Sequence, residues 1–146
     1  MSRLLALLLT AVMAMTGCAT QKPGLVVSDA RIGRPTGPNA ALYLTATGGE
    51  EDRLVAARTD VAARVVAHET IIDGDGTMSM RPLDDGISLP AGESLALAPG
   101  GYHLMLVDVD ELQTGASVSV TLVWENAGEM TVEAEVVEPE ETMGNG

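Results

Sequence analysis

The chain has 146 residues and contains 21 Asp and Glu against eight Lys and Arg, which gives a formal net charge of −13. So acidic a composition argues against nucleic acid as a partner, because phosphate backbones are bound by clusters of Lys and Arg. The single cysteine excludes an intrachain disulfide, so the fold must depend on its hydrophobic core.

The first 17 residues have the features of a secretory signal, with Arg3 followed by an apolar run over 4–15 and then by small residues. The sequence Met15-Thr16-Gly17-Cys18 resembles the lipobox of bacterial lipoproteins. That resemblance implies cleavage before Cys18, a lipid on its sulfur, and an extracytoplasmic protein anchored to a membrane. In a two-membrane cell we expect the periplasmic side of the outer membrane. Loss of Arg3 leaves a net charge of −14.

The remaining chain is long enough for one domain. Residues 18–24 are polar and suit a tether between a lipid anchor and a folded domain. Residues 138–146 are acidic and poor in apolar side chains, so we expect a flexible tail there. The folded domain is therefore predicted to span residues 25–137.

Short runs rich in Val, Leu, Ile and Thr alternate with Gly, Pro and Asp turns throughout this domain. No segment after the signal keeps the 3.6-residue apolar period of a helix. The pattern predicts an all-β sandwich. Its expected strands cover 25–32, 41–47, 53–57, 63–72, 78–83, 94–97, 102–107, 117–124 and 130–137.

The core must be built without Phe, which is absent from the chain. In the run over 117–124, Val118, Val120 and Leu122 fall on one face of the expected strand and polar residues on the other, which is typical of a half-buried strand. We expect Leu, Val, Ile and Ala to fill the core. Its larger candidate members are Trp124, Tyr43 and Tyr102.

The two histidines of the chain occur close to methionines. His103 and Met105 occupy alternate positions of one expected strand, so they face the same side while Leu104 and Leu106 can face the core. Met78-Ser79-Met80 repeats this spacing on another strand, which follows His68 after a Gly- and Asp-rich turn.

Thioether sulfur favours Cu(I), and imidazole is accepted by several first-row metals. A zinc site would use Cys, His and carboxylates, yet neither CxxC nor HExxH occurs, and a blue-copper centre requires a thiolate, for which Cys18 is not free. Taken singly, Met or His on a strand usually packs or plays a structural role, but their joint occurrence favours a Cu(I) site. No triad order, nucleophile elbow or P-loop occurs, so we expect no enzymatic activity.

Three segments resemble the periplasmic copper A chaperone family: Val66-Ala67-His68-Glu69-Thr70, Met78-Ser79-Met80-Arg81-Pro82 and Pro99-Gly100-Gly101-Tyr102-His103-Leu104-Met105-Leu106. The family pattern H-x(n)-M-x(n)-H-x-M implies that the Cu(I) ligands are His68, Met80, His103 and Met105. Each of the two longer spacings exceeds the family's by about one residue, so Met78 is an alternative to Met80.

The resemblance further implies a cupredoxin-like Greek-key β-sandwich and a metallochaperone. Its copper acceptor would be cytochrome c oxidase, at the copper A centre of subunit II, or another assembly factor. The alternative function is a copper-sequestering or resistance lipoprotein, which would use the same site without a specific acceptor.

Overall fold

The computed structural model describes residues 24–139. The predicted signal peptide (1–17), Cys18 with the tether up to residue 23, and residues 140–146 of the predicted tail lie outside that range. Within it, no helix is long and apolar enough to cross a membrane. The regular elements are β1 (Val26–Gly33), β2 (Asn39–Thr47), β3 (Asp52–Arg58), β4 (Ala62–Ile72), β5 (Met78–Pro82), β6 (Ile87–Leu89), β7 (Ser94–Leu97), β8 (Tyr102–Val109), β9 (Ser117–Trp124) and β10 (Gly128–Val137).

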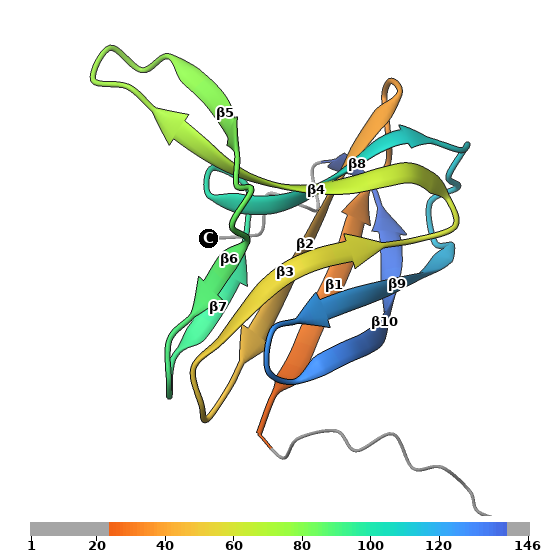
Figure 1. The fold of residues 1–146 in the computed structure, drawn as a ribbon. Coiled ribbons are helices and arrows are strands. Elements are labelled where there is room, and N and C mark those ends of the chain that lie inside the picture. Colours follow the sequence, from red (N-terminus) through yellow and green to blue (C-terminus); the bar gives the residue numbers. More distant parts are fainter. Residues whose placement is uncertain (1–23, 140–146) are drawn as a thin grey trace, which may run out of the picture.

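All these strands belong to one sheet, in the order β5-β4-β8-β2-β1-β10-β9-β3-β6, with β7 paired to β2 beyond the end of β8. β1 and β10 run parallel, and the other pairings are antiparallel. The sheet folds over on itself so that β3 and β9 cover β1 and β2 in a second layer (Figure 1). The predicted all-β sandwich is confirmed.

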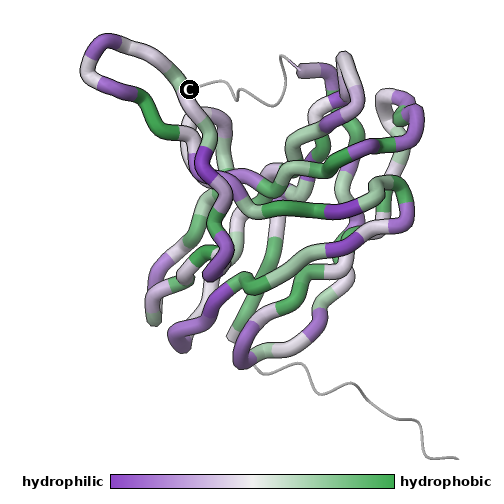
Figure 2. Tube along the Cα trace, turned by 45° about the horizontal axis from the view of Figure 1, so that its top comes forward, coloured by the Kyte–Doolittle hydropathy of each residue, from purple (hydrophilic) through white to green (hydrophobic). Residues whose placement is uncertain are grey.

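The core lies between the two layers, and strand alternation decides which side chains enter it. In β2 the alternate residues Ala40, Leu42, Leu44 and Ala46 are buried, while their neighbours are half-buried or exposed. Figure 2 shows apolar residues along the strands and hydrophilic ones at many of the turns. The core faces predicted for β8 and β9 are confirmed by the burial of Leu104, Leu106, Val118, Val120 and Leu122.

The larger aromatic residues do not all lie in the core. Trp124 is 2% exposed and packs inside, as predicted, and Tyr102 packs against the core. The expectation for Tyr43 was wrong, because this residue alternates with Leu42 and Leu44 and therefore faces away from the core.

The short strand β6 was not predicted. It has only three residues and sits between turn residues, so its apolar pattern is too brief to stand out. Its position depends on Gly86, whose φ is +79° and where a Cβ atom would lie 2.3 Å from the carbonyl oxygen of Leu54. A glycine lets the chain turn and approach β3 closely enough for β6 to pair with it.

The β4–β5 hairpin projects from the sandwich (Figure 1). Within residues 24–139, β5 is an edge strand that pairs only with β4, and all five of its residues are exposed. The hairpin carries three large exposed apolar side chains, Ile72, Met78 and Met80. This element therefore holds methionines where water and other molecules can reach them.

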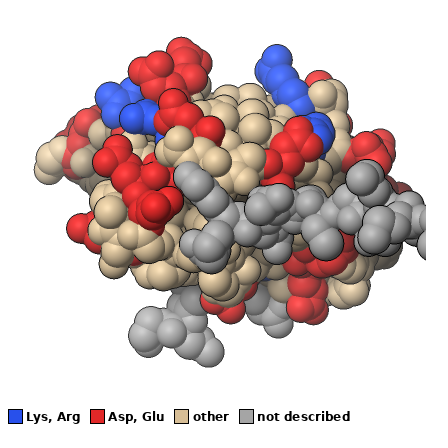
Figure 3. All heavy atoms as spheres, turned by 60° about the horizontal axis from the view of Figure 1, so that its bottom comes forward, with Lys and Arg blue, Asp and Glu red and all other residues tan. Residues whose placement is uncertain are grey.

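Acidic side chains are spread over the face of the molecule in Figure 3, with few basic ones among them. Some are paired across strands, as in the two hydrogen bonds of 2.9 and 2.7 Å from Arg58 to the carboxylate of Glu129. That pair is exposed, so it contributes little to stability. The surface charge acts chiefly on solubility and on the attraction of cations.

Candidate metal centre

His68 and His103 are brought together by the pairing of β4 with β8. They are directly opposite each other in the register of these antiparallel strands, so their side chains point to the same face of the sheet. The ring centroids lie 5.6 Å apart and the ring planes are inclined by 38°. This face is the one away from Leu104 and the core. Two residues that are 35 positions apart in the sequence thus form a pair of imidazoles.

His103 is almost fully buried, with 3% exposure, and its Nε2 has no hydrogen-bond partner among residues 24–139. Nδ1 lies 3.3 Å from the carbonyl oxygen of Gly101. Because a carbonyl only accepts hydrogen bonds, this contact places the proton on Nδ1 and leaves the lone pair on Nε2. Within the same described range, Nδ1 of His68 is also buried without a hydrogen-bond partner. Buried polar atoms without partners are uncommon in folded proteins, and a bound metal ion would satisfy both.

Burial also favours the uncharged form of His103. Desolvation lowers the pKa of its imidazole below the usual 6.5, the charge of His68 lowers it further, and the hydrogen bond to Gly101 opposes the shift. The neutral ring is the form that binds metals. His103 is therefore a ready nitrogen donor at neutral pH.

Met105 lies on the same face as His103, two residues further along β8. It stands opposite Ala41 of β2 and Val66 of β4 and is half-buried. Leu104, between the two, is 2% exposed and points into the core. The predicted placement of Leu104 and Leu106 on the core face of this strand, and of His103 and Met105 on the other face, is confirmed. We call the face that carries His68, His103 and Met105 the donor face, after the ligands predicted there.

Met80 and Met78 share the donor face but stand further out. In the β4–β5 register they lie opposite Thr70 and Ile72, two and four positions beyond His68. They are 59% and 63% exposed. Met80 is a diagonal neighbour of His68, which corresponds to about 7–8 Å between Cα atoms.

The two methionines proposed as ligands are not brought together by the sheet. Four positions along the strands and two strand spacings separate Met80 from Met105, about 16 Å on a flat sheet. The structure thus gathers His68, His103 and Met105, and places Met80 and Met78 on the hairpin at the edge of the same face.

Glu69, next to His68, does not belong to this face. It lies opposite Arg81 and accepts a hydrogen bond of 2.5 Å from its guanidinium. Because adjacent strand residues point to opposite sides, this pair is on the reverse of the hairpin. The carboxylate of Glu69 is thus engaged in an ion pair with Arg81, away from the two histidines.

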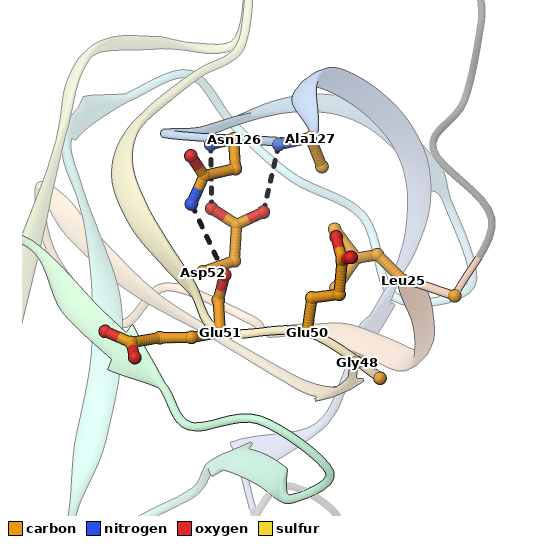
Figure 4. A pocket seen from close by; sticks show the side chains of 9 residues that line it. Leu25, Gly48, Glu50, Glu51, Asp52, Asn126 and Ala127 are labelled. Atoms are coloured by element: carbon orange, nitrogen blue, oxygen red, sulfur yellow. Dashed lines mark hydrogen bonds between the residues drawn. The ribbon is translucent and has the colours of Figure 1, made fainter.

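A small pocket elsewhere is lined by Glu50, Glu51 and Asp52 (Figure 4). Its buried carboxylate is already used, because Asp52 accepts hydrogen bonds from the backbone amides of Arg53, Asn126 and Ala127 at 2.8–3.0 Å. These bonds hold the β9–β10 turn against β3. Over residues 24–139, no group of three or more His, Cys, Asp or Glu side chains is arranged to hold a metal ion.

Tyr43 is the residue of this face that sequence reasoning missed. Its ring centroid lies 6.4 Å from that of His103, at an interplanar angle of 52°. The alternation of Leu42, Tyr43 and Leu44 in the sequence was the signal that could have placed it outside the core.

Comparison with known proteins identifies the family of this chain. A family model described as "Putative lipoprotein LpqE-like" matches residues 25–136. The chain belongs to the LpqE-like lipoprotein family. A relative named "Putative lipoprotein Lxx21020" from Leifsonia xyli subsp. xyli is 32% identical over 122 residues, which cover 74% of this chain and 73% of the relative.

Solved PCuAC domains, of the periplasmic copper A chaperone type, share the fold. The copper-bound PCuAC domain of PmoF2 is 26% identical, with a TM-score of 0.65 over 80% of this chain and 94% of that domain. The apo PCuAC domain of PmoF1 is 28% identical, with a TM-score of 0.66 over 80% and 95%. CuI-DR1885 of Deinococcus radiodurans is 26% identical, with a TM-score of 0.63 over 86% of each chain. The predicted family and its cupredoxin-like fold are confirmed.

Proposed function

We propose that this protein is an extracytoplasmic Cu(I) carrier whose ligands are His68, His103, Met105 and Met80. The observation that carries the proposal is the pair of neighbouring imidazoles, each with a buried nitrogen that has no hydrogen-bond partner in the part of the chain that the structure describes. Thioethers on the same face make the donor set soft, which favours Cu(I) over Zn²⁺ or Mg²⁺. The copper-bound PCuAC domain of PmoF2 and the Cu(I) form of DR1885 are similar proteins, which supports copper as the metal.

The four ligands are all neutral when they bind copper. Met sulfur does not titrate, and burial keeps His103 uncharged. Binding therefore requires no thiolate, which an oxidising compartment would threaten. A site of this kind binds the metal as cargo and releases it to a partner that offers a better set of ligands. The protein then acts as a metal carrier and catalyses no reaction.

The difference in exposure between the ligands gives a route for exchange. His103 is buried, whereas Met80 stands on the projecting hairpin and is accessible to another protein. We infer that Met80 is the first ligand replaced when an acceptor approaches. The copper A centre of cytochrome c oxidase subunit II, or another assembly factor, is the acceptor we propose.

The location is proposed on the basis of Cys18, which lies outside the described residues. We infer that a lipid on Cys18 anchors the protein to the outside of a membrane, at the periplasmic side of the outer membrane in a two-membrane cell. Mass spectrometry of the mature N-terminus tests this, because an unmodified peptide starting at another residue would contradict it. Cys18→Ser should release the protein and leave copper binding intact.

The test of the site is a double substitution, Met80→Leu with Met105→Leu. Leu is close to Met in volume, so the fold should be kept, while the loss of both sulfurs should abolish most of the Cu(I) affinity measured by competition with a chromophoric Cu(I) chelator. Met130→Leu is the matched control, since Met130 is a half-buried methionine of β10 packed against the core. Equal affinity in the double variant and the wild type would contradict the ligand assignment.

Transfer to an acceptor has its own readout. Copper-loaded protein should load the isolated copper A domain of an oxidase faster than the same concentration of free chelated copper does. A protein that binds Cu(I) tightly and transfers it to no such domain would instead be a copper-sequestering lipoprotein.

A further inference from the structure

Tyr43 continues the row of rings that contains the two histidines. Leu42 of β2 pairs with Leu104 of β8. Tyr43 follows Leu42 and His103 precedes Leu104, so these two residues stand side by side one position beyond that pair. The order across β2, β8 and β4 is thus Tyr43, His103, His68, with centroid separations of 6.4 and 5.6 Å. His103 lies between two rings, one on each side.

The hydrogen bond of His103 is too weak to fix its ring alone. The distance of 3.3 Å from Nδ1 to the carbonyl oxygen of Gly101 exceeds the usual 2.9–3.0 Å of an N–H···O bond. The same carbonyl oxygen also accepts a hydrogen bond from the backbone amide of Thr70, at 3.0 Å. Packing must therefore supply much of the constraint on the ring, and His68 and Tyr43 are the rings in contact with it.

Tyr43 has the properties of a packing group more than those of a ligand. It is half-buried, and burial raises the pKa of its hydroxyl above 10, so that the phenol stays protonated and neutral. The guanidinium of Arg31, opposite Tyr43 in the β1–β2 register, acts against this shift without reversing it. A neutral phenol contributes ring surface to His103 and is a poor donor to Cu(I).

We propose that Tyr43 is a positioning residue of the metal centre: its ring holds the imidazole of His103 in the orientation that presents Nε2 to copper. This rests on the proposed function for the identity of the metal. The benefit is preorganisation, because an imidazole that is already immobile loses little freedom when the metal binds. The hydroxyl takes no part, so Phe should replace Tyr43 and an aliphatic residue should not.

The test compares Tyr43→Phe, Tyr43→Leu and the control Tyr102→Leu. Tyr102 is also half-buried and lies next to His103, but on the opposite face of β8. We expect Tyr43→Leu to weaken Cu(I) binding about two- to tenfold, the cost of ordering one freed side chain. Tyr43→Phe and Tyr102→Leu should match the wild type. If Tyr43→Leu does not fold, Tyr43→Val, which suits a strand, replaces it.

A second readout needs no copper. Nitrogen-15 NMR of the histidine rings should show a single Nδ1-protonated form of His103 in the wild type and in Tyr43→Phe, and a mixture of tautomers in Tyr43→Leu. An unchanged His103 signal and unchanged affinity in Tyr43→Leu would overturn the inference, and so would an equal loss in Tyr43→Phe. If the wild type binds no Cu(I), the proposed function fails, while the NMR result still decides whether Tyr43 positions the ring.

Discussion

The two edges of the donor face are held very differently by the fold. On β8, His103 is 3% exposed, and between it and Met105 the side chain of Leu104 is anchored in the core. On β5, Met80 and Met78 are 59% and 63% exposed, and among the described strands β5 has a neighbour on one side only. A carrier needs both properties, since a preformed half retains the metal and an accessible half lets it leave.

The largest effect we expect is on the stability of the β8 half. Leu104→Ala should lower the free energy of unfolding by about 2–5 kcal/mol, because it removes a buried side chain and leaves a cavity. Met105→Ala should cost clearly less in the copper-free protein, because Met105 is only half-buried. Chemical denaturation measures both, and the reverse order would mean that the donor face is not the outer one.

Much of this division could be predicted from the sequence. Alternation in the segment around His103 placed its donors on one face and Leu104 in the core, and the structure bears this out. Alternation does not say what covers the outer face, however, so the packing of Tyr43 on His103 was missed. Nor does it give the distance between strands that are not neighbours, which is why the separation of Met80 from Met105 needed the register.

The next effect is on copper affinity. Met80→Leu should weaken Cu(I) binding on the order of tenfold, the equivalent of about 1.4 kcal/mol, whereas His103→Asn should remove a preformed buried donor and cost more. Chelator competition gives both values. Met78→Leu serves as the control. If Met78→Leu weakens binding and Met80→Leu does not, the exposed ligand is Met78, two residues earlier on the same strand.

Copper should also change the hairpin. Because about 16 Å on a flat sheet is too far for two methionines to share one ion, Met80 can join Met105 only if β5 moves toward β8. Hydrogen exchange over residues 72–82 should therefore slow when Cu(I) binds, and Met80→Leu should remove the effect. Equal exchange with and without copper would contradict a hairpin ligand.

The smallest effect we expect is on pH dependence. The pKa of His103 is lowered in the folded protein, so the unfolded chain binds a proton at a higher pH than the folded one. Stability of the copper-free protein should then fall as pH drops below about 6.5. Thermal unfolding at several pH values measures this, and His103→Gln should flatten that part of the profile; an identical profile in the variant would show that His103 is not the group responsible.

The central claim, a mixed nitrogen and sulfur site for Cu(I), is tested most directly by X-ray absorption at the copper edge. The purified protein loaded with one equivalent of Cu(I) should show both imidazole nitrogen and thioether sulfur neighbours, and the sulfur contribution should disappear in the Met80→Leu, Met105→Leu double variant. A spectrum of the wild type with only nitrogen and oxygen neighbours would contradict the account.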